Sequence, residues 1–317
     1  MEGRLMRVER RHAPDYAALL GRIHRELESR LGEGRVAAYI PELARVPAER
    51  FGMALVTADG RLFTVGDARE KFSIQSVSKV FTLALAIQLV GEALWKRCGR
   101  EPSGNPFNSL VQLERESGIP RNPFINAGAL VVTDIILERL KEARESVLSF
   151  LRALSGSADI HFDLKVAASE AATGHRNAAM AHFMKSFGNL KNPAAEVLDA
   201  YFHHCSIAMD CVQLAKACQF LANEGQLPAT GETVTTPAQT KHLNALMLTC
   251  GTYDAVGDFA YRVGLPAKSG VGGGIVAAMP RRFSVCVWAP GLDAQGNSLL
   301  GAQALELLTT YSGVSVF

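Results

Sequence analysis

Apolar residues recur at helical spacing near the start of the chain and through its middle. Between residues 15 and 31 they return every three or four positions, which is the period of an amphipathic helix. From Lys79 to about Leu246 helical patterns alternate with loops that are rich in Gly, Asn and Pro. The helices predicted in this middle part cover residues 79–97, 127–142, 147–154, 164–173, 178–187, 194–205, 209–223 and 237–248.

Strand patterns occur only toward the two ends. Residues 52–58 and 61–65 read as two strands, and Asp59-Gly60 between them is a strong signal for a two-residue hairpin. Residues 264–269, 274–279 and 283–289 are short apolar runs bounded by Gly or Pro, and a last helix is predicted over 299–311.

This order of elements predicts an α+β fold. We expect one antiparallel sheet built from both chain ends, with flanking helices and an all-helical insertion. The expected sheet subdomain comprises residues 1–70 together with 249–317, and the helical subdomain comprises residues 71–248. The two would form a single discontinuous unit, with a functional site in the cleft between them.

The stretch from Phe72 to Lys79 is the first candidate for chemistry. It leads into the apolar run 80–90, so Ser76 would lie near a helix N-terminus with Lys79 three residues later. Residues at this spacing share a helix face, with Cβ atoms roughly 5–6 Å apart. A neutral lysine amine can then take the serine proton and create a nucleophile. Alternatively, Ser76 is a helix cap and Lys79 a solvated residue, since this short motif also arises by chance.

A second candidate is the glycine-rich segment that begins at Lys268-Ser269-Gly270. It lacks the spacing of nucleotide-binding loops, which excludes that function. An S-x-x-K motif followed later by K-[ST]-G marks the serine penicillin-binding proteins and class A β-lactamases. The chain resembles that group in both motifs and in the predicted layout, so the expected fold is serine β-lactamase-like.

Further segments resemble a more particular family, the serine-dependent glutaminases in their compact microbial form. They run in family order across nearly the whole chain. The matching segments are residues 36–43 (VAAYIPEL), 75–79 (QSVSK), 101–104 (EPSG), 122–129 (NPFINAGA), 169–170 (SE), 176–177 (RN), 199–202 (DAYF), 205–206 (CS), 250–254 (CGTYD) and 264–271 (GLPAKSGV).

The resemblance implies hydrolysis of L-glutamine to L-glutamate and ammonia, with Ser76 as nucleophile and Lys79 as general base. Tyr201 or Tyr253 would relay a proton to the ammonia, and a γ-glutamyl ester on Ser76 would be hydrolysed by water. Lys268 is a secondary candidate whose role stays open. The residues that resemble the family's substrate contacts are Tyr39, Gln75, Ser76, Asn126, Glu170, Asn177, Tyr201, Tyr253 and Val271.

These residue types suit the chemistry of glutamine. Glu170 can pair with the α-ammonium, and Asn126 and Asn177 can donate amide hydrogens to the α-carboxylate. The backbone N–H groups of Ser76 and Val271 are candidates for holding the oxyanion.

Each of these residues also has a purely structural interpretation. Glu170 would be an exposed helix carboxylate, Asn126 a helix cap, Asn177 a loop or cap residue, and the tyrosines core residues with a satisfied hydroxyl.

Composition narrows the remaining classes. A net charge of +2 over 317 residues, with 48% hydrophobic residues, is typical of a soluble globular protein and gives no support for a nucleic-acid partner. No apolar core of a signal peptide follows the start, and the run 80–90 is too short to span a bilayer. The six cysteines form no C-x-x-C or zinc pattern, which favours reduced thiols in the cytoplasm. We expect no metal, no cofactor and no membrane partner, and a homo-oligomer (dimer or tetramer).

Two alternative functions stay open from sequence. One is a β-lactamase or transpeptidase-like serine acyltransferase on the same fold. The other is a glutamine-binding protein without catalysis.

Overall fold

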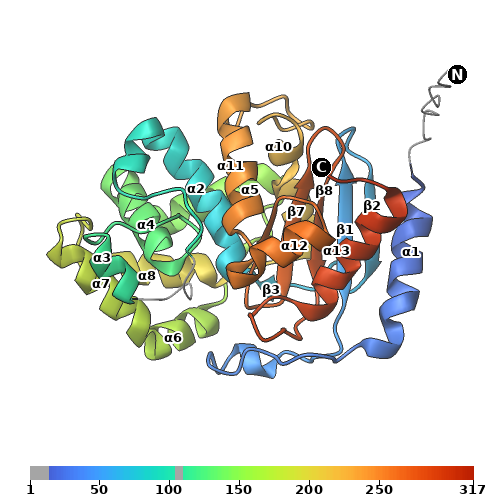
Figure 1. The fold of residues 1–317 in the computed structure, drawn as a ribbon, viewed down its shortest axis with the longest axis horizontal. Coiled ribbons are helices and arrows are strands. Elements are labelled where there is room, and N and C mark those ends of the chain that lie inside the picture. Colours follow the sequence, from blue (N-terminus) through green and yellow to red (C-terminus); the bar gives the residue numbers. More distant parts are fainter. Residues whose placement is uncertain (1–13, 104–109) are drawn as a thin grey trace, which may run out of the picture.

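A five-stranded antiparallel sheet forms one half of the molecule, and helices form the other (Figure 1). The computed structural model describes residues 14–103 and 110–317. The sheet order is β2-β1-β8-β7-β6, so strands from the beginning and the end of the chain lie side by side. Their bounds are β1 (Gly52–Thr57), β2 (Leu62–Gly66), β6 (Ala267–Ser269), β7 (Gly274–Met279) and β8 (Phe283–Trp288).

Both faces of this sheet are covered. Along β8, Val285 and Val287 pack with helices α1 (Tyr16–Leu27) and α13 (Leu299–Ser312), whereas Cys286 and Trp288 point into the core that the sheet shares with the helical half. Successive side chains of a strand point to opposite faces, so burial on both sides produces continuous apolar runs rather than alternation.

Helix α2 (Ser78–Val90) runs through the helical half, and its residues 78–87 are buried. The uniform burial explains its uninterrupted apolar sequence. The surrounding helices are α3 (Leu110–Arg115), α4 (Asn126–Leu140), α5 (Ala143–Ser155), α6 (Leu164–Thr173), α7 (His175–Ser186), α8 (Ala194–Cys205), α9 (Cys211–Ala217), α10 (Gln219–Ala222), α11 (Pro237–Cys250) and α12 (Val256–Arg262).

A second, small sheet lies directly before the Ser76 segment. It has the order β3-β5-β4, from β3 (Phe72–Ser73), β5 (Ile207–Met209) and β4 (His161–Phe162). Ile74 N donates to Ile207 O at 2.9 Å, which continues this pairing toward Ser76. The segment therefore enters α2 from a fixed backbone position.

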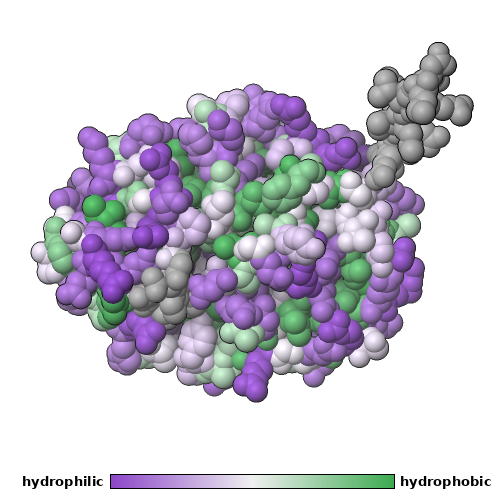
Figure 2. All heavy atoms as spheres, viewed as in Figure 1, coloured by the Kyte–Doolittle hydropathy of each residue, from purple (hydrophilic) through white to green (hydrophobic). Residues whose placement is uncertain are grey.

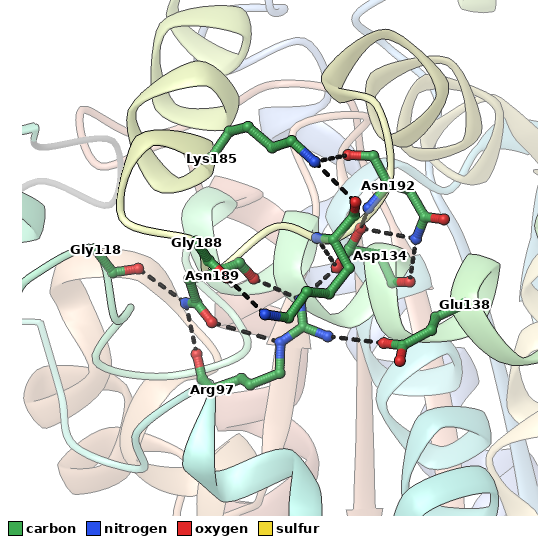
Figure 3. Close-up of polar contacts among 9 residues, drawn as sticks. Arg97, Gly118, Asp134, Glu138, Lys185, Gly188, Asn189 and Asn192 are labelled. Carbon is green, nitrogen blue, oxygen red and sulfur yellow. Dashed lines mark hydrogen bonds and ion pairs between the residues drawn. The ribbon is translucent and has the colours of Figure 1, made fainter.

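A buried polar network fastens the helical half at the C-terminal end of the α2 segment (Figure 3). The Asp134 carboxylate on α4 forms an ion pair with Arg97 and accepts hydrogen bonds from Lys191 N at 2.9 Å and Asn192 N at 2.8 Å. Asn189 Nδ2 donates to Arg97 O at 2.9 Å and Gly118 O at 2.8 Å. The network thus joins α4 to the loop that precedes α8.

The predicted α+β fold class, with a sheet from both chain ends and a helical insertion, is confirmed. The exact subdomain boundaries stay a prediction. Residues 1–12, which bear on the expected absence of a signal peptide, and Gly104 of the 101–104 segment lie outside the described residues.

Several predicted elements were wrong in detail. The helix expected over 79–97 ends at Val90, because Gly91 takes φ +52°, and a 3-10 helix covers Gly91–Lys96. The helix expected over 209–223 is split into β5, α9 and α10, and Asp210 forms a capping box with Gln213. The strand expected over 264–269 begins only at Ala267, after Gly264 with φ +65°.

Among the described residues, one helical run, Gln75–Lys96, has the length and composition to cross a membrane: it has 22 residues and contains a window with a mean hydropathy of 1.5. It is longer than the apolar run predicted from sequence, but 67% of its apolar window is buried in the protein. Core helices of globular proteins pass the same test, so the run is weak evidence for a span. Polar and apolar side chains are interspersed on the face of the molecule shown in Figure 2.

Candidate active site

A cavity of about 640 Å³ brings together nine of the ten residues to which the resemblance gives a catalytic or substrate-binding role. Its walls come from both halves of the molecule, including the segment 35–40, the Ser76 turn, helices α4, α6, α7 and α8, and the loop 292–296. The predicted residues that line it are Tyr39, Gln75, Ser76, Asn126, Glu170, Asn177, Tyr201, Tyr253 and Val271. Lys79, the tenth, is 2% exposed and contacts Asn126 from behind the cavity wall.

Ser76 lies in a single 3-10 turn, Gln75–Val77, that leads into α2. Gln75 before it takes φ +49°, a left-handed conformation that is uncommon for a residue with a side chain. The glycine-rich loop packs against this turn, because a Cβ on Gly272 would lie 2.3 Å from Ser73 O. The two backbones therefore approach each other closely, and Val271 of the loop lines the cavity together with Ser76.

The Lys79 amine is held by two oxygen acceptors. Nζ donates to Asn126 Oδ1 at 2.7 Å and to Phe124 O at 3.2 Å. Burial lowers the pKa of this amine from 10.5 to about 8, although the nearby Cys205 and Glu170 oppose the shift. About a tenth of the amine is therefore neutral at pH 7, far more than for an ordinary lysine. Neither hydrogen bond goes to Ser76, so the proximity expected from the i, i+3 spacing leaves the hydroxyl without a direct bond to the amine.

Asn126 is the first residue of α4, and Ile125 is the N-cap, so the interpretation of Asn126 as a helix cap is wrong. Its side chain instead accepts from Lys79 and donates from Nδ2 to Asn177 Oδ1 at 3.0 Å. This chain of contacts leaves Asn177 Nδ2 for a ligand in the cavity.

Glu170 lies on α6 and is 6% exposed, which excludes the exposed helix carboxylate considered from sequence. Burial raises its pKa from 4.5 to about 7, whereas a hydrogen bond from the Gln75 side chain and the charge of Lys79 act in the opposite direction. Gln75 Nε2 also donates to Ser73 Oγ at 2.9 Å. A buried carboxylate in a cavity is a suitable partner for a ligand's ammonium group.

Tyr201 and Tyr253 are both buried at the cavity, and burial raises the pKa of both hydroxyls. For Tyr253, hydrogen bonding with the Ser76 side chain and the Val271 backbone opposes this increase in pKa. Tyr253 also takes φ +52°. Of the two tyrosines, Tyr253 is therefore the one whose hydroxyl pKa responds to Ser76. Tyr39, 61% exposed, lies in the segment 35–40 at the cavity edge.

Lys268 lies behind Tyr253 on β6 and is fully buried. Its Nζ donates to Ser269 O at 2.5 Å and lies 4.6 Å from the centre of the Tyr253 ring. Burial, and then the charge of Lys79, hold the pKa of this amine well below 10.5. The residue supports Tyr253 without reaching the cavity.

The structure adds groups that sequence reasoning did not assign. Phe124 contributes a backbone carbonyl, whose direction no residue type reveals. Arg35, Arg176, Cys205 and Asp293 also line the cavity. Cys205 and Arg176 fall within segments already recognised by resemblance, which was the available signal. Across residues 14–103 and 110–317, no group of three or more His, Cys, Asp or Glu side chains is placed to hold a metal ion.

Comparisons with known proteins agree on one family. A family model described as glutaminase matches residues 34–317. The chain is 61% identical over 303 residues to a glutaminase of Ralstonia nicotianae, covering 96% of this chain and 100% of that one. It is 58% identical over 302 residues to a glutaminase of Streptomyces coelicolor, covering 95% and 98%.

Two solved structures are similar over almost their whole length. A probable glutaminase named ybaS has a TM-score of 0.88 at 36% identity, covering 95% of this chain and 99% of that chain. A probable glutaminase of Bacillus subtilis has a TM-score of 0.88 at 31% identity, covering 96% and 99%.

Proposed function

This chain belongs to the glutaminase family, and we propose that it hydrolyses L-glutamine through an acyl-enzyme on Ser76 with Lys79 as general base. The observation that carries this mechanism is the buried Lys79 amine, held beside the cavity by Phe124 O and Asn126 Oδ1. Its pKa of about 8 supports a base that is partly neutral at physiological pH.

The two acceptors also orient the amine. A neutral amine has two N–H bonds and one lone pair, and Phe124 O and Asn126 Oδ1 occupy both N–H bonds. The lone pair is then free to take the proton of Ser76 as Ser76 Oγ attacks the side-chain amide carbon of glutamine. A protonated amine has no such lone pair, so the step requires the neutral form.

Substrate recognition follows from the charges in the cavity. Glu170, ionised, pairs with the α-ammonium, and the ammonium in turn favours the ionised carboxylate. Asn177 Nδ2 and the second Nδ2 hydrogen of Asn126 are available to the α-carboxylate, since the other Asn126 hydrogen is donated to Asn177. Backbone N–H groups of Ser76 and Val271 would hold the developing oxyanion.

Tyr253 is the better candidate for delivering a proton to the departing ammonia. Hydrogen bonding with the Ser76 side chain acts on the pKa of the Tyr253 hydroxyl, whereas Cys205 and Glu170 act on the pKa of Tyr201. Tyr253 recovers its proton from protonated Lys79, which passes on the Ser76 proton in this way and becomes neutral again. Water then attacks the γ-glutamyl ester, Lys79 accepts a proton from that water, and the proton returns to Ser76 Oγ as glutamate leaves.

The test is an ammonia-release assay with glutamine and asparagine on the wild type and on Ser76→Ala, with binding measured by calorimetry. We expect ammonia from glutamine, much less from asparagine, and retained binding without turnover in Ser76→Ala. Asparagine is shorter by one methylene, which misplaces its amide relative to Ser76. Unchanged turnover in Ser76→Ala would refute the acyl-enzyme.

The same experiment separates the alternatives. Glutamine binding without ammonia release by the wild type would support a binding protein. Labelling of Ser76 by penicillin at low concentration, without glutamine turnover, would support a β-lactamase-like acyltransferase.

We further infer a cytoplasmic homo-oligomer. All six cysteines are free and buried, which supports a reducing compartment. Homo-oligomers are common among soluble enzymes, which is the ground for expecting one here. Light scattering after gel filtration would test the oligomer, and a single-chain mass would refute it.

A further inference from the structure

Asn122 is a buried side chain two residues before the carbonyl that holds Lys79. It is 1% exposed, and all three of its hydrogen bonds go to the backbone. Oδ1 accepts from Phe124 N at 3.0 Å and Ile125 N at 3.1 Å, and Nδ2 donates to Glu101 O at 2.9 Å. The first of these bonds closes an Asx-turn, which fixes the peptide units around Phe124.

This turn determines where the Phe124 carbonyl points. Phe124 N and O belong to adjacent peptide units, so holding the N–H on Asn122 constrains the carbonyl that accepts from Lys79 Nζ at 3.2 Å. Ile125 N, the second donor to Asn122, belongs to the same peptide unit as Phe124 O. The orientation of that peptide plane is therefore set directly by the Asn122 side chain.

The surroundings leave the turn little freedom to move. A Cβ on Gly128 would lie 1.9 Å from Asn122 O, so the backbone at Asn122 rests against the first turn of α4. On the other side, Glu101 N donates to Arg121 O at 2.9 Å and Gly99 N donates to Pro120 O at 2.7 Å. The turn is thus braced by α4 and by the segment that follows Cys98.

We propose that Asn122 is a positioning residue for Lys79: its Asx-turn aims the Phe124 carbonyl at the amine and so directs the amine's lone pair toward Ser76. The inference rests on the proposed function, in which Lys79 is the general base. Nothing in the resemblance assigned Asn122 a role.

The direction of the pKa shift at Lys79 follows from the charge that the Phe124 carbonyl stabilises. A carbonyl oxygen favours the protonated amine over the neutral one, so a misdirected Phe124 carbonyl lowers the pKa of Lys79 below about 8. The neutral amine then appears at lower pH, but with its lone pair poorly aimed. Loss of Asn122 should therefore lower kcat while moving the acid limb of its pH profile to lower pH.

The experiment compares Asn122→Ala, Asn122→Ser and Asn189→Ala by kcat against pH. The kcat profile is chosen because Glu170 already holds the ammonium in the bound complex. For Asn122→Ala we expect kcat to fall about tenfold and the limb to move down by about half a pH unit, with KM nearly unchanged. A serine hydroxyl can still accept a hydrogen bond from the Phe124 N–H, so in Asn122→Ser the acid side of the profile should lie close to its wild-type pH.

Asn189→Ala is the matched control, since Asn189 is also a buried asparagine that bonds to two backbone carbonyls (Figure 3). Its partners, Arg97 O and Gly118 O, do not contact Lys79. It should lower the thermal midpoint to a similar extent and leave the acid limb where it is.

The outcomes are distinguishable. The positioning role would be overturned if the acid side of the kcat–pH profile did not shift in a folded Asn122→Ala protein, or if it shifted equally in Asn189→Ala. Neither result would affect the proposed function. If Asn122→Ala does not fold, the kcat–pH profile of Asn122→Ser decides. The inference would be refuted if the structure of Asn122→Ser had lost the turn while the acid side of its profile stayed at the wild-type pH. Full activity of Lys79→Met would instead refute the proposed function.

Discussion

Lys79 and Glu170 lie close enough that the charge of each shifts the pKa of the other. Burial shifts both toward neutrality, to about 8 for the Lys79 amine and about 7 for the Glu170 carboxyl. The form required by the proposed mechanism has Glu170 ionised and Lys79 neutral. This combination of charges predominates only when the pH is above both pKa values.

The first prediction is therefore an alkaline rise in activity. We expect kcat/KM for glutamine to increase with pH and to reach half its maximum near the Lys79 pKa of about 8. The measurement is ammonia release at subsaturating glutamine from pH 6 to 10. An optimum below pH 6 would exclude Lys79 as the base.

Glu170→Gln should change how stability depends on pH. The pKa of Glu170 is raised from 4.5 to about 7, so the folded chain holds a proton through this window that the unfolded chain has released. The contribution of Glu170 to the free energy of unfolding is intact below pH 4.5. It falls by roughly 3 kcal/mol as the pH rises through 7. Glutamine stays neutral, so the variant should gain stability relative to the wild type between pH 5 and 8.

Urea unfolding at pH 5, 6, 7 and 8 measures this difference in the free energy of unfolding. A difference that stays constant with pH would show that Glu170 does not titrate in this window. The same variant should have a greatly raised KM for glutamine, because the α-ammonium loses its anionic partner.

Tyr253→Phe should reduce turnover more than Tyr201→Phe. Both rings are buried and both variants keep the ring, so their stabilities should be similar. Of the two hydroxyls, that of Tyr253 is the one whose pKa responds to Ser76, and losing a proton donor in the transition state costs about a hundredfold in kcat. Steady-state kinetics of the two variants provide the test, and a larger loss in Tyr201→Phe would reverse the assignment.

The buried ion pair of Arg97 and Asp134 should be essential for stability and remote from the chemistry (Figure 3). Asp134 is fully buried and also accepts from Lys191 N and Asn192 N, so Asp134→Ala leaves several donors without a partner. We expect a loss of about 3–5 kcal/mol in the free energy of unfolding.

Glu138→Gln is the control for this prediction, because Glu138 is the second partner of Arg97 and its side chain is 46% exposed. Its removal should cost less than about 1 kcal/mol. Similar losses in the two variants would mean that burial of Asp134 contributes little. Residual activity per folded molecule should be unchanged in both.

Residue types and their order were sufficient to identify the cavity residues but not their surroundings. Helical spacing placed Ser76 and Lys79 at the start of one helix, and the structure has both there. It did not reveal the acceptors of Lys79, because Asn126 comes from another helix and Phe124 acts through its backbone. Glu170 was expected to be exposed from sequence, since its burial depends on α8, which packs against α6, and on the Gln75 side chain, which lies far away in the sequence.

Local signals that compete with tertiary packing explain the remaining differences. The apolar pattern of 79–97 continues past Gly91, yet the backbone turns there. The small sheet β3-β5-β4 consists of strands of two or three residues, too short to show any periodicity.

The position of β8 in the middle of the large sheet has a consequence for synthesis. β1 and β2 leave the ribosome early, but β8, the neighbour of β1, emerges only after every residue of the helical half. The early hairpin therefore exposes an unpaired strand edge while the helices are being made. The Ser76 turn likewise waits for the glycine-rich loop before β7, so nascent chains that stall in this interval are open to strand pairing with one another and have no assembled cavity.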